Sequence, residues 1–169
     1  WSSKSTMWQF ENVDTIGSLL QIDPKECAQI QVGNGLFGIR QQLLKTQAEY
    51  LSQKYHCVVT NPPYLGKGVC DVLKSYVNEY YVEGKADLCT CFTLRQGYFT
   101  VKNGFYANII PPSWMFLSTF EGLRRSIIEK QTIQSLLHFS RGVFGADFGS
   151  VSCVIQNKKN ENACGTYFR

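Results

Sequence analysis

The sequence predicts an α/β fold in which a mostly parallel sheet is covered by helices. Segments with helical periodicity alternate along the chain with short apolar segments typical of buried strands. Two of the apolar segments, 56–60 and 105–110, are each followed closely by a pair of prolines. The last two predicted strands are joined by a short loop without a helix, so one strand near the C-terminal end is expected to run antiparallel.

The N-terminal half is expected to contain a short strand and a long helix. WQFENV (8–13) has the composition of a short strand. After Gly33 and Gly35, the segment GIRQQLLKTQAEYLSQK (38–54) carries apolar residues near helical spacing, which predicts an amphipathic helix. HCVVT (56–60) then reads as a strand, so a helix leads directly into a strand, as α/β alternation requires.

The C-terminal half continues this alternation. Residues 69–81 fit either a helix or an irregular lid. Asp87 is predicted to be the N-cap of a helix that ends at the glycine of Lys102-Asn103-Gly104. FYANII (105–110) is predicted to be a central strand that Pro111-Pro112 terminates. The remaining predicted elements are a helix at 119–130 and strands at 133–139 and 151–157.

Composition favours one globular domain in a reducing compartment, the cytosol. Seventeen Lys and Arg against thirteen Asp and Glu give a net charge of +4, which is compatible with a polyanionic partner but does not require one. Seven cysteines, an odd number, stand largely in apolar stretches, as reduced core thiols do. No segment has the pattern of a signal peptide or a membrane span, and the spacing of His and Cys predicts no metal site.

The segment HCVVTNPPYLGKG (56–68) predicts a binding site at the end of its strand. Ligands of open parallel sheets bind outside the carboxyl ends of the strands, where both proline pairs are expected. The Asn61 side chain and the Pro62 backbone can offer two carbonyl oxygens to the hydrogens of an aromatic amine, which favours a pyramidal, nucleophilic nitrogen. Pro63 adds no competing donor, and Tyr64 offers a flat face for stacking. An ordinary turn is the competing interpretation, because Asn and Pro are common in turns.

These segments resemble the ordered motifs of a known enzyme family. VVTNPPYLGKG resembles motif IV of amino-methyltransferases that use S-adenosylmethionine, and Asn in first place resembles their adenine-specific branch. ADLCTCF resembles motif V, GFYANIIPPSWMFLSTFEGLR resembles motif VI with its following helix, and GVFGADFGSVSCVIQNK resembles motif VIII. Together with FENVDTIGSLLQ they are similar, over about residues 8–159, to gamma-class adenine-specific DNA methyltransferases, most of all the large BREX-type (PglX-like) enzymes.

The resemblance implies part of a doubly wound (Rossmann-like) class I methyltransferase sheet that carries motifs III to VIII. It implies a site-specific DNA adenine methyltransferase of a restriction-modification or phage-defence system in the bacterial cytoplasm. S-adenosylmethionine would be the cofactor, and double-stranded DNA with a flipped adenine would be the substrate. Other phage-defence proteins are candidate partners, and no membrane association is expected.

The resemblance also assigns roles to individual residues. Asn61, Pro62, Pro63 and Tyr64 would form the catalytic segment, in which Asn61 and Pro62 accept hydrogen bonds from the adenine amino group. Tyr64 would also bind substrate, by stacking on a base that has left the duplex.

Three further residues receive roles outside this segment. Asp14 and Phe92 would contact the cofactor, and Phe144 would be a second aromatic side chain against the flipped base. Asp14 is equally consistent with a turn or capping residue, and Phe92 with a core residue at helical spacing.

The cofactor half of the expected site is largely missing from this sequence. No aromatic-x-Gly-x-Gly loop occurs, and the glycines of VGNGLFG (32–38) follow the motif III region. Trp1 stands where an initiator Met is expected. Residues 1–169 are therefore expected to be a single partial catalytic domain, without the cofactor glycine loop or a target-recognition domain, and inactive alone.

Two alternative functions remain open from the sequence. Methyltransferases that act on protein glutamine or on ribosomal RNA also use Asn-Pro-Pro-Tyr, although PPSWMF (111–116) and VFGADFGSVS (143–152) argue against these usually shorter enzymes. A non-catalytic DNA-binding or assembly module of a defence complex is the other alternative. In such a module the catalytic segment could have been lost, and the intact Asn-Pro-Pro-Tyr at 61–64 argues against that loss.

Overall fold

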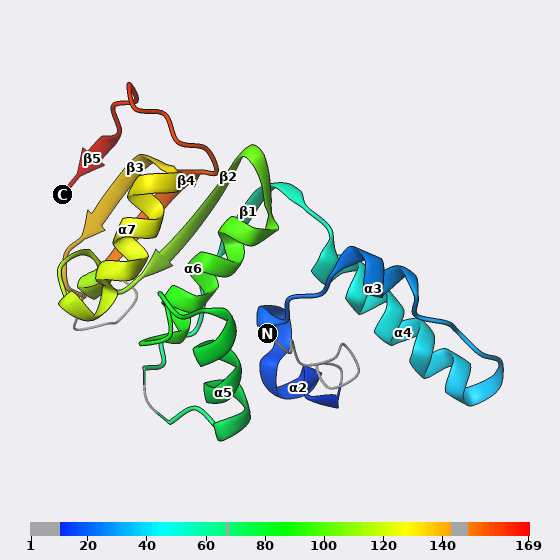
Figure 1. The fold of residues 1–169 in the computed structure, drawn as a ribbon. Helices are drawn as coiled ribbons and strands as arrows, with labels where there is room; N and C mark the ends of the chain where they lie inside the picture. The colour runs from blue at the N-terminus through cyan, green and yellow to red at the C-terminus, as the bar shows by residue number, and fades with distance from the viewer. Residues whose placement is uncertain (1–10, 67, 143–148) are drawn as a thin grey trace. The chain divides into compact units, whose positions relative to one another are not determined.

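The computed structural model describes residues 11–66, 68–142 and 149–169. The chain divides into two compact units, Trp1–Lys54 and Tyr55–Arg169, and each is described separately. Their elements are shown in Figure 1. Among the described helices, none is both long and apolar enough to cross a bilayer.

The first unit is helical where it is described. It contains α2 (Val13–Ile16), a 3-10 turn at Gly17–Leu19, α3 (Pro24–Ala28) and α4 (Gly35–Ser52). The predicted long helix is confirmed as α4. The strand predicted at 8–13 is wrong in its described part, because Val13 begins a helix and Glu11 and Asn12 are not extended.

The second unit is built on one five-stranded mixed sheet. Its strands, β1 (Tyr55–Thr60), β2 (Thr100–Ile110), β3 (Thr132–Phe139), β4 (Ser150–Gln156) and β5 (Thr166–Phe168), follow the order β1-β2-β4-β3-β5. β4 pairs antiparallel with both of its neighbours, whereas β1 pairs parallel with β2 and β3 pairs parallel with β5. The prediction of a mostly parallel sheet with an antiparallel strand near the C-terminal end is confirmed.

Three helices and two 3-10 turns connect these strands: α5 (Asp71–Tyr80), α6 (Leu88–Phe99), Pro112–Met115, Ser118–Phe120 and α7 (Glu121–Lys130). Figure 1 shows α6 and α7 on the same side of the sheet. Tyr106 and Ile110 of β2 form one core cluster with Cys89 of α6 and Leu123 of α7. Burial of these apolar side chains between the sheet and the two helices therefore stabilises the end of β2, where the second proline pair begins.

α6 begins where the sequence predicts and ends earlier. The Asp87 carboxylate accepts a hydrogen bond from the Cys89 backbone at 2.9 Å, which confirms the predicted N-cap. Asn103 has a left-handed φ of 69°, but it lies inside β2 and not at the end of the helix. The β1–β2 register jumps there, from Tyr55 opposite Thr100 to Cys57 opposite Phe105, so the left-handed residue belongs to a strand irregularity.

A buried polar network holds α6 against β1 and β2. Gln96, only 2% exposed, donates from Nε2 to the Ala107 carbonyl at 2.7 Å and to the Val58 carbonyl at 3.3 Å. Its Oε1 accepts from Asn108 Nδ2 at 3.0 Å, and Asn108 also donates to Thr93 Oγ1 at 3.1 Å. Gln96 thus connects α6 to both β1 and β2, and we expect the pairing of these two strands to depend on it.

Gln96→Ala is expected to loosen the parallel pair β1–β2. The substitution leaves the Ala107 carbonyl and the Asn108 amide with fewer partners in a buried place, which costs about 1–3 kcal/mol. Hydrogen exchange followed by mass spectrometry should show faster exchange in β1 and β2. Gln134→Ala is the matched control, because half-buried Gln134 bonds to Gln156 on the β3–β4 side of the sheet. Equal exchange of β1 in the two variants would contradict the role given to Gln96.

Candidate active site at the carboxyl edge of the sheet

The parallel pairing of β1 with β2 brings the two proline pairs to one edge of the sheet. Thr60 stands opposite Asn108, so the chain leaves β1 at Asn61 while β2 continues to Ile110. Tyr64 and Pro111 then line the same cavity. The predicted site at the carboxyl ends of these two strands is therefore present as a cavity.

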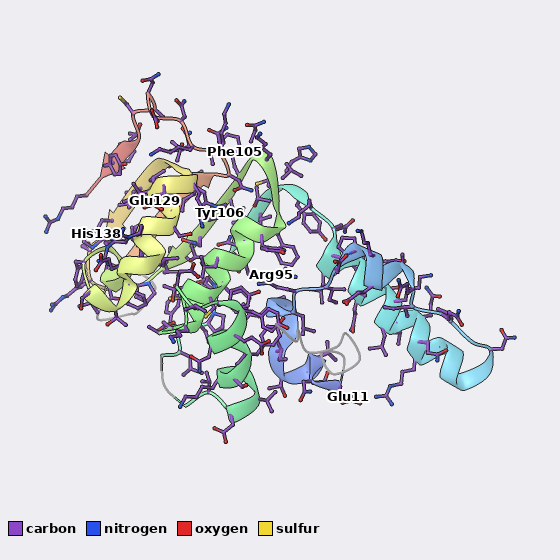
Figure 2. All side chains as sticks on the ribbon, viewed as in Figure 1. Glu11, Arg95, Phe105, Tyr106, Glu129 and His138 are labelled. Atoms are coloured by element: carbon purple, nitrogen blue, oxygen red, sulfur yellow. The ribbon has the colours of Figure 1, made fainter. Side chains whose placement is uncertain are left out.

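The cavity has a volume of about 960 Å³. Its wall combines aromatic, proline and charged side chains from both proline loops, from the N-cap of α6 and from the carboxyl end of β3. One of them, His138, is labelled in Figure 2. The lining residues are Tyr64, Asp87, Pro111, Pro112, Ser113, Phe116, His138, Phe139, Ser140, Arg141, Gly149 and Arg169.

Tyr64 is the residue of the predicted catalytic segment that lines this cavity. Asn61 and Pro63 are exposed, Pro62 is buried, and Tyr64 is 38% exposed. The Tyr64 hydroxyl lies 2.9 Å from Asn61 Oδ1 and 3.0 Å from the Ile109 carbonyl oxygen, and it can donate to either. The Asn61 amide oxygen thus lies beside the Tyr64 hydroxyl, and Tyr64 presents part of its surface to the cavity.

The Tyr64 hydroxyl is a neutral donor. Burial raises the pKa of this hydroxyl above its usual value. The Cys89 thiol is itself protonated, because burial raises its pKa, and the adjacent Asp87 carboxylate adds to the effect. The hydroxyl therefore keeps its proton at physiological pH and orients the Asn61 carbonyl oxygen.

This arrangement can accept the hydrogens of an amine. An amide oxygen carries two lone pairs, so one donor from Tyr64 leaves Asn61 Oδ1 with capacity for another. Pro62 and Pro63 carry no backbone N–H, so these two positions offer carbonyl oxygens without a competing backbone donor. A planar ring placed against Tyr64 would bring its exocyclic amine toward the Asn61 oxygen.

The other predicted site residues belong to other parts of the sequence. Phe92 is half-buried on α6 in the second unit, and Asp14 is exposed in the first turn of α2 in the first unit. Phe144 falls outside the described residues. The described residues hold no aromatic-x-Gly-x-Gly loop.

Sequence reasoning missed part of the cavity wall. Ser113, His138 and Phe139 line the cavity. Their positions just after β2 and at the end of β3 are the sequence feature that could have predicted this. Arg124 donates to the Trp114 and Leu117 carbonyls at 2.8 and 2.6 Å. It therefore stabilises the loop that carries the second proline pair.

Comparison with known sequences gives a family match over most of the chain. Residues 5–144 match the family described as Eco57I restriction-modification methylase. The chain is 34% identical over 128 residues to adenine-specific methyltransferase BrxX of Escherichia coli O9:H4 (strain HS), covering 73% of this chain and 11% of that protein. It is 36% identical over 124 residues to adenine-specific methyltransferase PglX of Lacticaseibacillus casei (strain Zhang), covering 70% of this chain and 10% of that protein.

Solved structures share the fold at low sequence identity. A putative class I S-adenosylmethionine-dependent methyltransferase from Listeria monocytogenes has a TM-score of 0.54 at 12% identity, covering 81% of this chain and 47% of that one. The M protein of the type I restriction enzyme EcoKI has a TM-score of 0.53 at 16% identity, covering 91% and 36%. The fold is that of a class I methyltransferase, as predicted.

The chain spans about a tenth of the length of the curated relatives that it matches. The predicted resemblance to PglX-like enzymes is confirmed by these relatives, and the family match extends across both proline loops. On this sequence and fold, the chain belongs to the Eco57I restriction-modification methylase family.

Proposed function

We propose that this chain is part of the catalytic domain of a DNA adenine methyltransferase. The reaction is transfer of a methyl group from S-adenosylmethionine to the exocyclic amino group of adenine in a specific DNA sequence. The observation that carries the proposal is that Tyr64 lines a cavity of about 960 Å³ while its hydroxyl lies 2.9 Å from Asn61 Oδ1. The names of the relatives BrxX and PglX support adenine as the acceptor.

The residues of this chain would bind and orient the base. The amino group cannot be reached inside the duplex, so the adenine must leave the stack and stand against Tyr64. Asn61 Oδ1 and the Pro62 carbonyl would accept its two amino hydrogens and direct the nitrogen lone pair away from the ring plane. The cofactor supplies the methyl group. No general base is needed, because the amine can lose its proton after transfer.

The wider setting follows from the same relatives. We place the reaction in a restriction-modification or phage-defence system of the bacterial cytoplasm, with double-stranded DNA as partner. Residues 1–169 would be a partial catalytic domain, and Asp14 and Phe92 would contact the cofactor once the remainder of the site is supplied. The cofactor glycine loop and a target-recognition domain are expected in parts of such proteins that this chain does not match.

Asn61→Ala in the full-length protein is expected to abolish adenine methylation. The substitution removes an acceptor of the reacting amine, and loss of one such preorganised group lowers the rate by about 100-fold or more. The measurement is mass spectrometry of nucleosides from the DNA of cells that express each variant. Asn78→Ala is the matched control, because Asn78 is an exposed residue of α5 away from the lining of the cavity. Methylation by the Asn61 variant at the level of this control would contradict the proposal.

Analysis of DNA, protein and ribosomal RNA from the same cells distinguishes between the alternative methyl acceptors. A wild-type protein that leaves DNA unmodified but methylates glutamine in protein or a base in ribosomal RNA would replace the proposed substrate. A non-catalytic module would leave all three unmodified and would keep any defence activity in the Asn61→Ala variant.

Tyr64→Phe and Tyr64→Ala should differ in adenine methylation. Phe keeps the ring and loses only the hydroxyl bonds to Asn61 and Ile109, so a loss below about tenfold is expected for one net hydrogen bond. Ala also loses stacking of about 1–3 kcal/mol, so a further loss of about 5- to 150-fold is expected. Single-turnover methylation assays with the full-length protein provide the comparison. Equal rates for the two variants would show that the ring does not stack on the base.

A further inference from the structure

The backbone just after Tyr64 is held by the start of α6. The Leu65 N–H donates to Asp87 Oδ1 at 3.2 Å, and the Leu65 carbonyl accepts from the Leu88 N–H at 3.1 Å. Both backbone groups of the residue after Tyr64 are therefore satisfied by residues more than twenty positions later. This pairing fixes where the loop leaves the cavity rim.

The carboxylate that holds this loop also caps the helix. Asp87 Oδ1 accepts from the Cys89 N–H at 2.9 Å as well as from Leu65. The N-terminus of α6 favours a negative charge at this place, because the free N–H groups and the helix dipole both point toward it. The same oxygen thus couples the loop to the helix, and Asp87 lines the cavity together with Tyr64.

The loop approaches Asp87 closely at Gly66. A Cβ on Gly66 would lie 3.2 Å from the Ala86 carbonyl oxygen and 3.3 Å from Asp87 Oδ2. Such distances are tighter than most carbon contacts, so a side chain there requires the loop or its neighbours to shift by a few tenths of an ångström. Leu65 and Gly66 together form a continuous contact with Ala86 to Leu88.

We propose that Asp87 is a positioning residue that holds the Tyr64 ring at the cavity rim through the backbone of Leu65. The ring would be fixed at two ends: its hydroxyl by Asn61 and Ile109, and its backbone by Asp87. This inference rests on the proposed function, because it concerns how Tyr64 meets a base. A residue that only capped α6 would affect stability without affecting the position of the base.

The test uses the full-length protein and a duplex with 2-aminopurine at the adenine that the wild-type protein methylates. Fluorescence of 2-aminopurine rises when the base unstacks and is quenched again when it stacks on an aromatic ring. Asp87→Ala should change this signal and lower methylation by about tenfold or more, since small misplacements of reacting groups are costly. Asp87→Asn keeps a carbonyl oxygen and a good N-cap, so it should recover most of the activity.

Asp23→Ala is the matched control for loss of a cap. Asp23 caps α3 by accepting from the Lys25 N–H at 2.8 Å, and this bond joins neighbours within one turn. The variant should lose a comparable capping bond and keep wild-type fluorescence and methylation. Asp87→Ala behaving like Asp23→Ala, or Asp87→Asn losing as much as Asp87→Ala, would overturn the proposal.

Gly66→Ala tests the same contact without removing the capping carboxylate. The added methyl group should displace the loop from Asp87 and reduce methylation while α6 remains capped. Gly122→Ala is its control, because a Cβ there would meet Glu83 at an ordinary distance of 3.5 Å. Wild-type methylation by Gly66→Ala would contradict the positioning role, even if Asp87→Ala proved too unstable to purify.

The outcome for Asn61→Ala separates this inference from the proposed function. Methylation that survives in Asn61→Ala means that the site itself is misassigned. Methylation lost in Asn61→Ala but unchanged in both Asp87→Ala and Gly66→Ala means that the site is right and that the positioning role is wrong.

Discussion

The parallel pairing of β1 with β2 is the constraint on which the rest of the site depends. Prolines cannot donate to a ladder, so each strand must end where its proline pair begins. Because the two strands run in the same direction, both ends fall at one edge of the sheet, and Thr60 opposite Asn108 sets their offset. Reversing either strand would put Tyr64 and Pro111 at opposite edges and leave no shared cavity.

Polar as well as apolar contacts from α6 stabilise this pairing. Gln96 reaches the carbonyls of Val58 and Ala107, one on each strand, and so opposes their separation. Polar groups buried this deeply stabilise only the arrangement that satisfies them, whereas apolar side chains tolerate shifts. The network therefore contributes to the register of the sheet edge as well as to its stability.

Local patterns predicted most of the second unit, and contacts between distant residues account for what they missed. Helical spacing, strand composition and the proline pairs all act within a few residues. They placed α6, β1 and the loop at 61–64 in the second unit, as well as α4 in the first. The segment Lys102-Asn103-Gly104 predicted a left-handed residue, and Asn103 is one, but it lies in β2 and not at the end of α6. Only the pairing of β2 with β1 shows that the helix has already ended. The bond between Leu65 and Asp87 spans twenty-two positions, and no sequence period encodes it.

The hydrogen bonds of Tyr64 also bear on how a base would enter. A neutral hydrogen bond contributes about 0.5–1.5 kcal/mol net, whereas stacking of a base on an aromatic ring contributes about 1–3 kcal/mol. Because Asn61 Oδ1 can accept a second hydrogen bond, an adenine amino group can bond to it while the Tyr64 hydroxyl stays in place. The Leu65 backbone bonds also remain. The ring therefore need not move to admit the base, and stacking adds to the hydrogen bonds already present.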